Sequence, residues 1–130
     1  MSRLAYERML FLTAATLNLV AALTILIKPM VFLERMRVAD PAATVIARAL
    51  FSSVATWGVA YALIGYDPIR FRDFAWLGVI SKLLFFTVQT ASFRQGRLSR
   101  TAYLPALVDL LLAILFIEYL WQNPAPIDVR

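Results

Sequence analysis

Four long apolar stretches fill most of this chain, and each of them contains a strongly polar or charged residue. The stretches cover residues 9–27, 42–66, 74–93 and 101–121. A helix of about 20 apolar residues crosses the hydrocarbon layer of a bilayer, which is about 30 Å thick. The sequence therefore predicts an all-α integral membrane protein, a four-transmembrane-helix bundle whose spans are these stretches.

The composition argues against a soluble fold, because 62% of the residues are hydrophobic and only 16% are charged. A length of 130 residues leaves room for the spans and short connections, so we expect a single membrane domain over 1–130. Arg3 and Arg8 precede the first stretch as in a signal sequence. That stretch is longer than a cleavable core, so we expect a retained helix. The tail, 122–130, contains two prolines and is expected to be disordered.

The connections predict the topology. Loop one, 28–41, is bracketed by prolines and mixes large apolar with charged residues, which indicates a segment in the membrane interface. Loop two, 67–73, begins with Asp-Pro, so the second and third spans should be antiparallel neighbours. In loop three, 94–100, Gly96 is placed to end one helix and Ser99 to cap the next.

We call the end with the N-terminus and loop two side A, and the end with loops one and three side B. Basic residues are nearly balanced between the two sides, so they assign no orientation. The same balance fits a chain that inserts both ways and forms antiparallel dimers. The net charge of +5 comes from residues that flank spans, which indicates anionic lipid headgroups as partners and not nucleic acid.

The chain has neither Cys nor His, which removes disulfides, thiol redox chemistry, His-ligated metals and Ser-His nucleophiles. We therefore predict no metal and no cofactor. Ser81 and Lys82 are the residue types of a Ser–Lys hydrolase, but adjacent helical residues do not face each other. Catalysis is left open and is less expected than a non-catalytic role.

Polar residues inside the spans are the candidate ligand-binding site, because charges within a bilayer face one another or a cavity. With a rise of ~1.5 Å per residue, Asn18 lies ~14 Å and Lys82 ~12 Å from side A. Arg48 lies ~9 Å and Asp109 ~12 Å from side B. These depths predict two polar layers, one with Arg48 and Asp109 and the other with Lys82 and Asn18.

Helical angle and small neighbours predict which sides point inward. Asp109 and Glu118 face opposite ways, and we expect Asp109 inside and Glu118 near the headgroups. Ser52 shares with Arg48 a stripe of small and hydroxyl residues, and Gln89 shares one with Gly78 and Lys82; such stripes favour close helix packing. The candidate ligand-binding residues are Lys82, Arg48, Asp109, Asn18, Gln89 and Ser52.

Arg48 and Lys82 against Asp109 leave one surplus positive charge, which an anion, Glu118 or loss of a proton could remove. We therefore predict binding or transport of an anionic or amphipathic small molecule. Two alternatives stay open. The polar residues can be structural, with Arg48 reaching side B and Lys82 paired with Asp109. The protein can also be a non-catalytic accessory subunit of a larger membrane complex, or a homo-oligomer.

The segment Gly65-Tyr66-Asp67-Pro68-Ile69-Arg70-Phe71-Arg72, followed by Gly78, Lys82 and Asp109, resembles uncharacterised small four-span bacterial inner-membrane proteins. In size and span number these are loosely similar to the DoxX-like group. The resemblance covers the last three spans, while the first span lacks the glycines of that group. It implies a location in the bacterial inner (plasma) membrane and supplies no mechanism.

Overall fold

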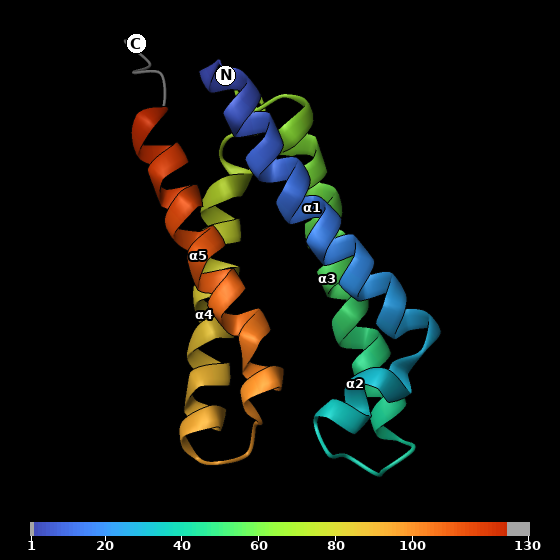
Figure 1. Cartoon of the computed structure of the whole chain (residues 1–130). Coiled ribbons are helices and arrows are strands. Elements are labelled where there is room, and N and C mark those ends of the chain that lie inside the picture. The colour runs from blue at the N-terminus through green and yellow to red at the C-terminus, as the bar shows by residue number, and fades with distance from the viewer. Residues whose placement is uncertain (1, 125–130) are drawn as a thin grey trace.

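The computed structural model describes residues 2–124, and this part of the chain is entirely helical apart from its connections. Figure 1 shows the helices, which are α1 (Arg3–Ile27), α2 (Pro29–Arg35), α3 (Ala43–Tyr66), α4 (Phe74–Arg94) and α5 (Arg100–Gln122). Within the described residues, four of them, all except α2, are long and apolar enough to cross a membrane. The predicted all-α class is confirmed.

The helix ends agree with the local signals in the sequence. Ser99 Oγ accepts a hydrogen bond from the backbone N–H of Ala102 at 3.2 Å and so caps α5. Gly96 ends α4 with φ +71°, a backbone conformation that suits a residue without a side chain. In loop two, Asp67 Oδ1 accepts from the backbone N–H of Arg70 at 3.1 Å, which closes the turn.

Loop one contains the short helix α2, which begins at Pro29. Its Leu33 is buried with Ile25 of α1 and Ala47 of α3 in a small apolar cluster, against which Phe32 and Phe51 also pack. This segment is therefore held against the first two long helices. Its position in a membrane interface stays a prediction.

The long helices form two pairs. α1 packs along most of α3, and α4 packs along α5, whereas contacts between the pairs are few. Figure 1 shows that the pairs meet at side A and separate toward side B. The main core lies where they meet and includes Phe11, Tyr61, Val79, Phe116 and Tyr119. Each pair therefore depends on its own internal contacts at side B.

Glycines bring α1 and α3 close together. A Cβ atom on Gly58 would lie 2.7 Å from Leu19 Cγ, and one on Gly65 would lie 2.8 Å from Leu12 Cγ. The two glycines are seven residues apart and so share one face of α3. Small residues on one face let membrane helices pack at short range, and here the leucines of α1 occupy the space that the glycines leave.

A polar network joins the pairs at side A. Glu7 of α1 is only 6% exposed, and its Oε1 accepts from Asn123 Nδ2 at 2.8 Å. Arg72 of loop two donates to the carbonyls of Asn123 and Leu120. The prediction of a disordered tail from residue 122 is therefore wrong at its start. Gln122 belongs to α5, and Asn123 is held through its side-chain amide by Glu7 and through its carbonyl by Arg72. Residues 125–130 lie outside the described part of the chain.

Candidate functional site

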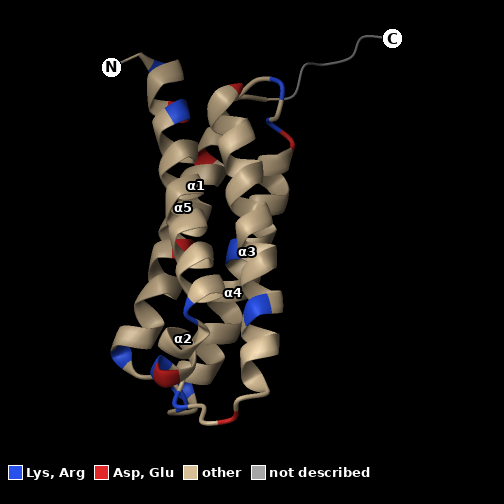
Figure 2. Ribbon diagram, turned by 90° about the vertical axis from the view of Figure 1, so that its right-hand side faces the viewer, with Lys and Arg blue, Asp and Glu red and all other residues tan. Residues whose placement is uncertain are grey.

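A buried ion pair links α4 and α5 at mid-height. Lys82 is 2% exposed, and its Nζ lies 2.5 Å from Asp109 Oδ1. The same Nζ lies 5.3 Å from the ring centroid of Tyr61 on α3, so the ammonium group also has an aromatic neighbour from the other helix pair. Figure 2 shows how few charged residues lie between the two ends of the helices. Asp109 therefore neutralises Lys82, the most deeply buried cation of the described residues.

Small residues make this arrangement possible. A Cβ on Gly78, one turn before Lys82, would lie 2.8 Å from Tyr61 Cε1 and 3.2 Å from Phe116 Cε2. On α5, Ala106 and Ala113 are fully buried, one turn on either side of Asp109. Aromatic rings and helix backbones therefore close around the pair, as the stripe on α4 predicted.

The predicted polar layers are wrong in their pairing. Asp109 binds Lys82, and Arg48 and Asn18 make no side-chain hydrogen bond or ion pair within residues 2–124. The reason lies in side-chain length. The backbone of Lys82 is ~12 Å from side A and that of Asp109 ~12 Å from side B, so in a ~30 Å layer their depths differ by ~6 Å. A flexible lysine side chain can span this difference. The structural alternative, in which Lys82 pairs with Asp109, is the arrangement found.

The predicted inward stripe of α3 is also wrong. Arg48, Ser52 and Thr56 are exposed, and the buried face of α3 carries Gly58 and Tyr61 instead. Ser52 Oγ donates to the backbone carbonyl of Arg48 at 2.7 Å. Hydroxyls that bond to the preceding turn of their own helix need no partner on another helix, so they do not mark a packing face. Ser52 and Arg48 are therefore not brought to Lys82.

Two other candidate residues, Asn18 on α1 and Gln89 on α4, make no bond to the pair. Asn18 and Gln89 are half-buried, and neither amide has a side-chain hydrogen bond in the described part of the chain. Gln89 is two turns beyond Lys82 on the same side of α4, in the direction of side B. Asn18 is one turn beyond the buried Ala14 on α1. Asp109 keeps 23% of its side chain exposed.

Asn18 and Gln89 lie on the same faces of α1 and α4 that, nearer to side A, contribute residues to the core shared by the two pairs. Asn18 continues the side of Ala14, and Gln89 continues the side of Gly78 and Lys82. Toward side B the pairs separate, as Figure 1 shows. Along their helices Asn18 and Gln89 therefore lie farther toward side B than the shared core, whereas Arg48 and Ser52 lie on the exposed face of α3.

The sequence did not predict the polar network at side A. Glu7 Oε1 accepts hydrogen bonds from Arg3 Nε at 3.0 Å and from the side-chain amide of Asn123. Tyr119 donates from its hydroxyl to the carbonyl of Pro68. The available signal was the spacing of Arg3 and Glu7, since opposite charges four residues apart on a helix are neighbours. Nothing in the sequence pointed to Asn123, 116 residues away from Glu7.

The chemical inventory of the site is limited. The described residues contain no group of three or more His, Cys, Asp or Glu that could hold a metal ion. Over residues 2–124, no hydrogen bond joins Lys82 to a serine, and its ammonium group is engaged by Asp109. The site offers an ion pair, and the amides of Asn18 and Gln89, elsewhere on α1 and α4, are further groups that can form hydrogen bonds.

Comparisons of this chain with protein-family models, with characterised proteins and with solved structures gave no match.

Proposed function

We propose that this protein is an integral membrane protein of the bacterial inner membrane that binds or transports an amphipathic small molecule between its two helix pairs. The polar part of the ligand lies at the Lys82–Asp109 pair, and its apolar part extends toward side B. One observation carries this proposal: Asn18 and Gln89, half-buried and without side-chain partners among the described residues, lie on α1 and α4 beyond the shared core, toward side B.

The exposed faces of the long helices support the membrane location. Large apolar side chains are exposed on each of them, including Ile27 at 71%, Ile46 at 72% and Leu84 at 63%. Faces of this kind are stable against lipid and costly in water. The apolar exterior fits a protein whose solvent is the bilayer.

The ion pair favours an amphipathic ligand over a simple anion. Lys82 and Asp109 cancel each other, so the surplus charge inferred from the sequence is carried by Arg48, which lies exposed on α3. A neutralised pair has no excess attraction for an anion. Asp109 Oδ2 can instead accept a hydrogen bond from a head group, and the amides of Asn18 and Gln89 can donate or accept one; such bonds are stronger where water is excluded.

Native mass spectrometry of the protein, gently extracted from its own membrane, tests this proposal. We expect a discrete bound mass, distinct from that of a phospholipid, in the wild type that is lost in the double variant Lys82→Met, Asp109→Leu. Replacing both charges removes the polar site without stranding either partner, and such exchanges often preserve the fold. Glu118→Gln is the matched control, because this carboxylate is exposed. Retention of the mass in the double variant would contradict the proposal.

Arg48 supports a second candidate, the accessory subunit. Its guanidinium is exposed on α3 and has no carboxylate partner within the described residues. A cation ~9 Å inside a membrane is costly unless it reaches the headgroups or pairs with another chain. In the same mass spectra, a stoichiometric complex with a larger chain that dissociates in Arg48→Leu, but not in Arg97→Leu, would establish this role instead.

A further inference from the structure

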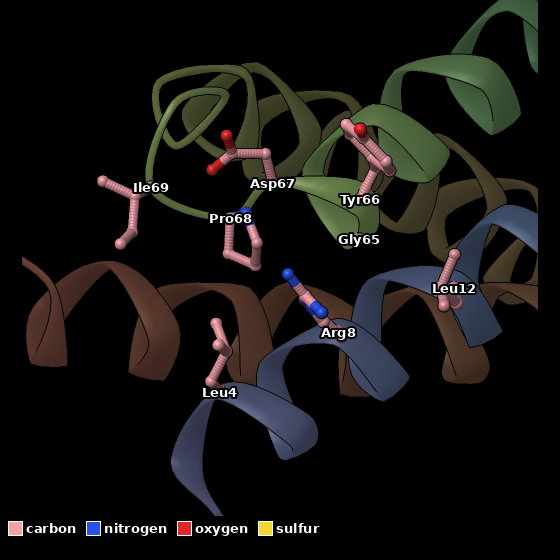
Figure 3. Close-up of a pocket in the computed structure, with 8 residues that line it drawn as sticks. All are labelled: Leu4, Arg8, Leu12, Gly65, Tyr66, Asp67, Pro68 and Ile69. Carbon is pink, nitrogen blue, oxygen red and sulfur yellow. The ribbon is translucent and has the colours of Figure 1, made fainter.

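A recess at side A is independent of the site between the helix pairs. It lies between the start of α1 and loop two and has a volume of about 540 Å³. Figure 3 shows the residues around it. They are mostly apolar, with one cation and one carboxylate: Leu4, Arg8, Leu12, Gly65, Tyr66, Asp67, Pro68 and Ile69.

Arg8 supplies the free charge of this recess. Its neighbour Arg3 binds Glu7, and Arg72 binds Asp73, whereas Arg8 has no hydrogen bond or ion pair anywhere in residues 2–124. In Figure 3 the guanidinium of Arg8 lies beside Pro68, and the Asp67 carboxylate is directed away from it. That carboxylate accepts from the backbone N–H of Arg70 at 3.1 Å. The recess therefore presents an uncompensated cation among apolar walls.

A second depression continues from the recess along α1. It has a volume of about 310 Å³ and is lined by Met9, Leu12, Thr13, Thr16 and Leu17, so Leu12 borders both hollows. The Thr16 hydroxyl donates to the backbone carbonyl of Leu12 at 2.8 Å and is not available to a ligand. From Arg8 to Leu17 the helix rises by ~14 Å, in the direction of the membrane interior.

We propose that these two hollows form a binding site for one glycerophospholipid with an anionic headgroup. The phosphate lies at Arg8 in the recess, and an acyl chain follows the depression along α1 from Leu12 to Leu17. Arginine binds phosphate oxygens through charge-assisted hydrogen bonds, and a cation at the end of a span is placed at headgroup level. The apolar depression holds the part of the lipid that a free phosphate lacks.

Titration of the detergent-solubilised protein with lipid, followed by native mass spectrometry, tests the headgroup half of the site. Phosphatidylglycerol and phosphatidylcholine with identical acyl chains are compared. We expect the wild type to bind phosphatidylglycerol roughly tenfold more tightly, a difference of about 1.4 kcal/mol. Arg8→Gln should remove this preference, whereas Arg97→Gln, an exposed arginine of loop three, should keep it. Equal losses in the two variants would overturn the proposal, because they would indicate only general attraction by basic loops.

Thr16→Phe tests the acyl half, because an aromatic ring placed there fills the depression while Arg8 is retained. We expect Thr16→Phe to bind phosphatidylglycerol more weakly. In a separate competition experiment, inorganic phosphate should not displace the lipid from the wild type. Unchanged binding in Thr16→Phe, or displacement of the lipid by phosphate, would contradict a lipid site. Arg8 and Thr16 are exposed, so neither change should prevent folding. The variant Lys82→Met, Asp109→Leu keeps Arg8 and should bind this lipid normally, which separates the two proposals.

Discussion

The two helix pairs of this protein are held together by different physical means. In the α1–α3 pair, Gly58 and Gly65 receive leucines of α1 at close range. In the α4–α5 pair, Lys82 binds Asp109, and near side B the hydroxyls of Thr90 and Tyr103 are 2.8 Å apart. The Tyr103 ring also stacks on Phe93, with centroids 4.6 Å apart.

In the proposed membrane location the hydrophobic driving force between helices is weak, and the two pairs would then represent two ways for helices to associate without it. Close packing at glycines makes the first pair sensitive to added volume. Polar bonds make the second pair sensitive to loss of a charge or a hydroxyl. Substitutions that add volume should therefore destabilise the α1–α3 pair more, and substitutions that remove polar groups should destabilise the α4–α5 pair more.

The largest effect is expected for Asp109→Asn, because it leaves the buried Lys82 without its counter-charge. Loss of one partner of a buried ion pair costs about 3–5 kcal/mol. Thermal unfolding in detergent should show a clear decrease in melting temperature, and Glu118→Gln, at an exposed position of the same helix, should show little change. Adding Lys82→Met to Asp109→Leu should restore most of the stability that the single change Asp109→Leu removes. Equal shifts for Asp109→Asn and Glu118→Gln would show that the ion pair does not hold the second pair together.

The next effect is expected for Gly65→Ala in the first pair. The new methyl group would lie 2.8 Å from Leu12 Cγ and 3.2 Å from the Leu12 backbone nitrogen, so the helices must move apart. Overpacking of this kind costs about 1–3 kcal/mol. Thermal unfolding measures it, and Leu12→Ala in the same chain should recover part of the loss. A more stable Gly65→Ala variant would mean that helix propensity outweighs close packing here.

A smaller effect is expected for Tyr103→Phe, which removes the hydroxyl bonded to Thr90 and keeps the stacked ring. Interhelical hydrogen bonds in membrane proteins contribute about 0.6 kcal/mol on average. Tyr66→Phe is the matched control, since Tyr66 is 75% exposed and has no side-chain hydrogen bond among residues 2–124. Amide hydrogen exchange near side B should increase in Tyr103→Phe alone.

The smallest effect on stability is expected for Arg48→Leu. This side chain is exposed and contributes no ion pair within the described residues, so the free energy of unfolding of the isolated chain should change by no more than about 0.5 kcal/mol. Thermal unfolding of purified protein measures this. A decrease as large as that of Asp109→Asn would restore the Arg48–Asp109 layer that the sequence predicted.

The helices and most of their ends could be predicted from the sequence, because the length of an apolar stretch, a helix-ending Gly96 and a capping Ser99 are local signals. It also placed Asp109 inside and Glu118 outside, since helical angle separates them. The sequence left the Lys82–Asp109 pair only as an alternative to the two layers, because the depth of a backbone position does not give the depth of a long side chain. The hydroxyls of α3 misled for a related reason: Ser52 and Thr56 bond to their own helix. The spacing of Gly58 and Gly65 was the better indicator of a packing face.

The network at side A has a consequence for synthesis of the chain. Glu7 emerges from the ribosome first, and its partner Asn123 follows 116 residues later. Arg72, which binds the backbone at Asn123 and Leu120, likewise waits for the last helix. The first pair, α1 and α3, can form as soon as both have been translated, but these bonds cannot join the two pairs until Asn123 has been translated, after all four long helices. Chains truncated before Asn123 should therefore be degraded faster, because they lack the residue that joins the two pairs at side A.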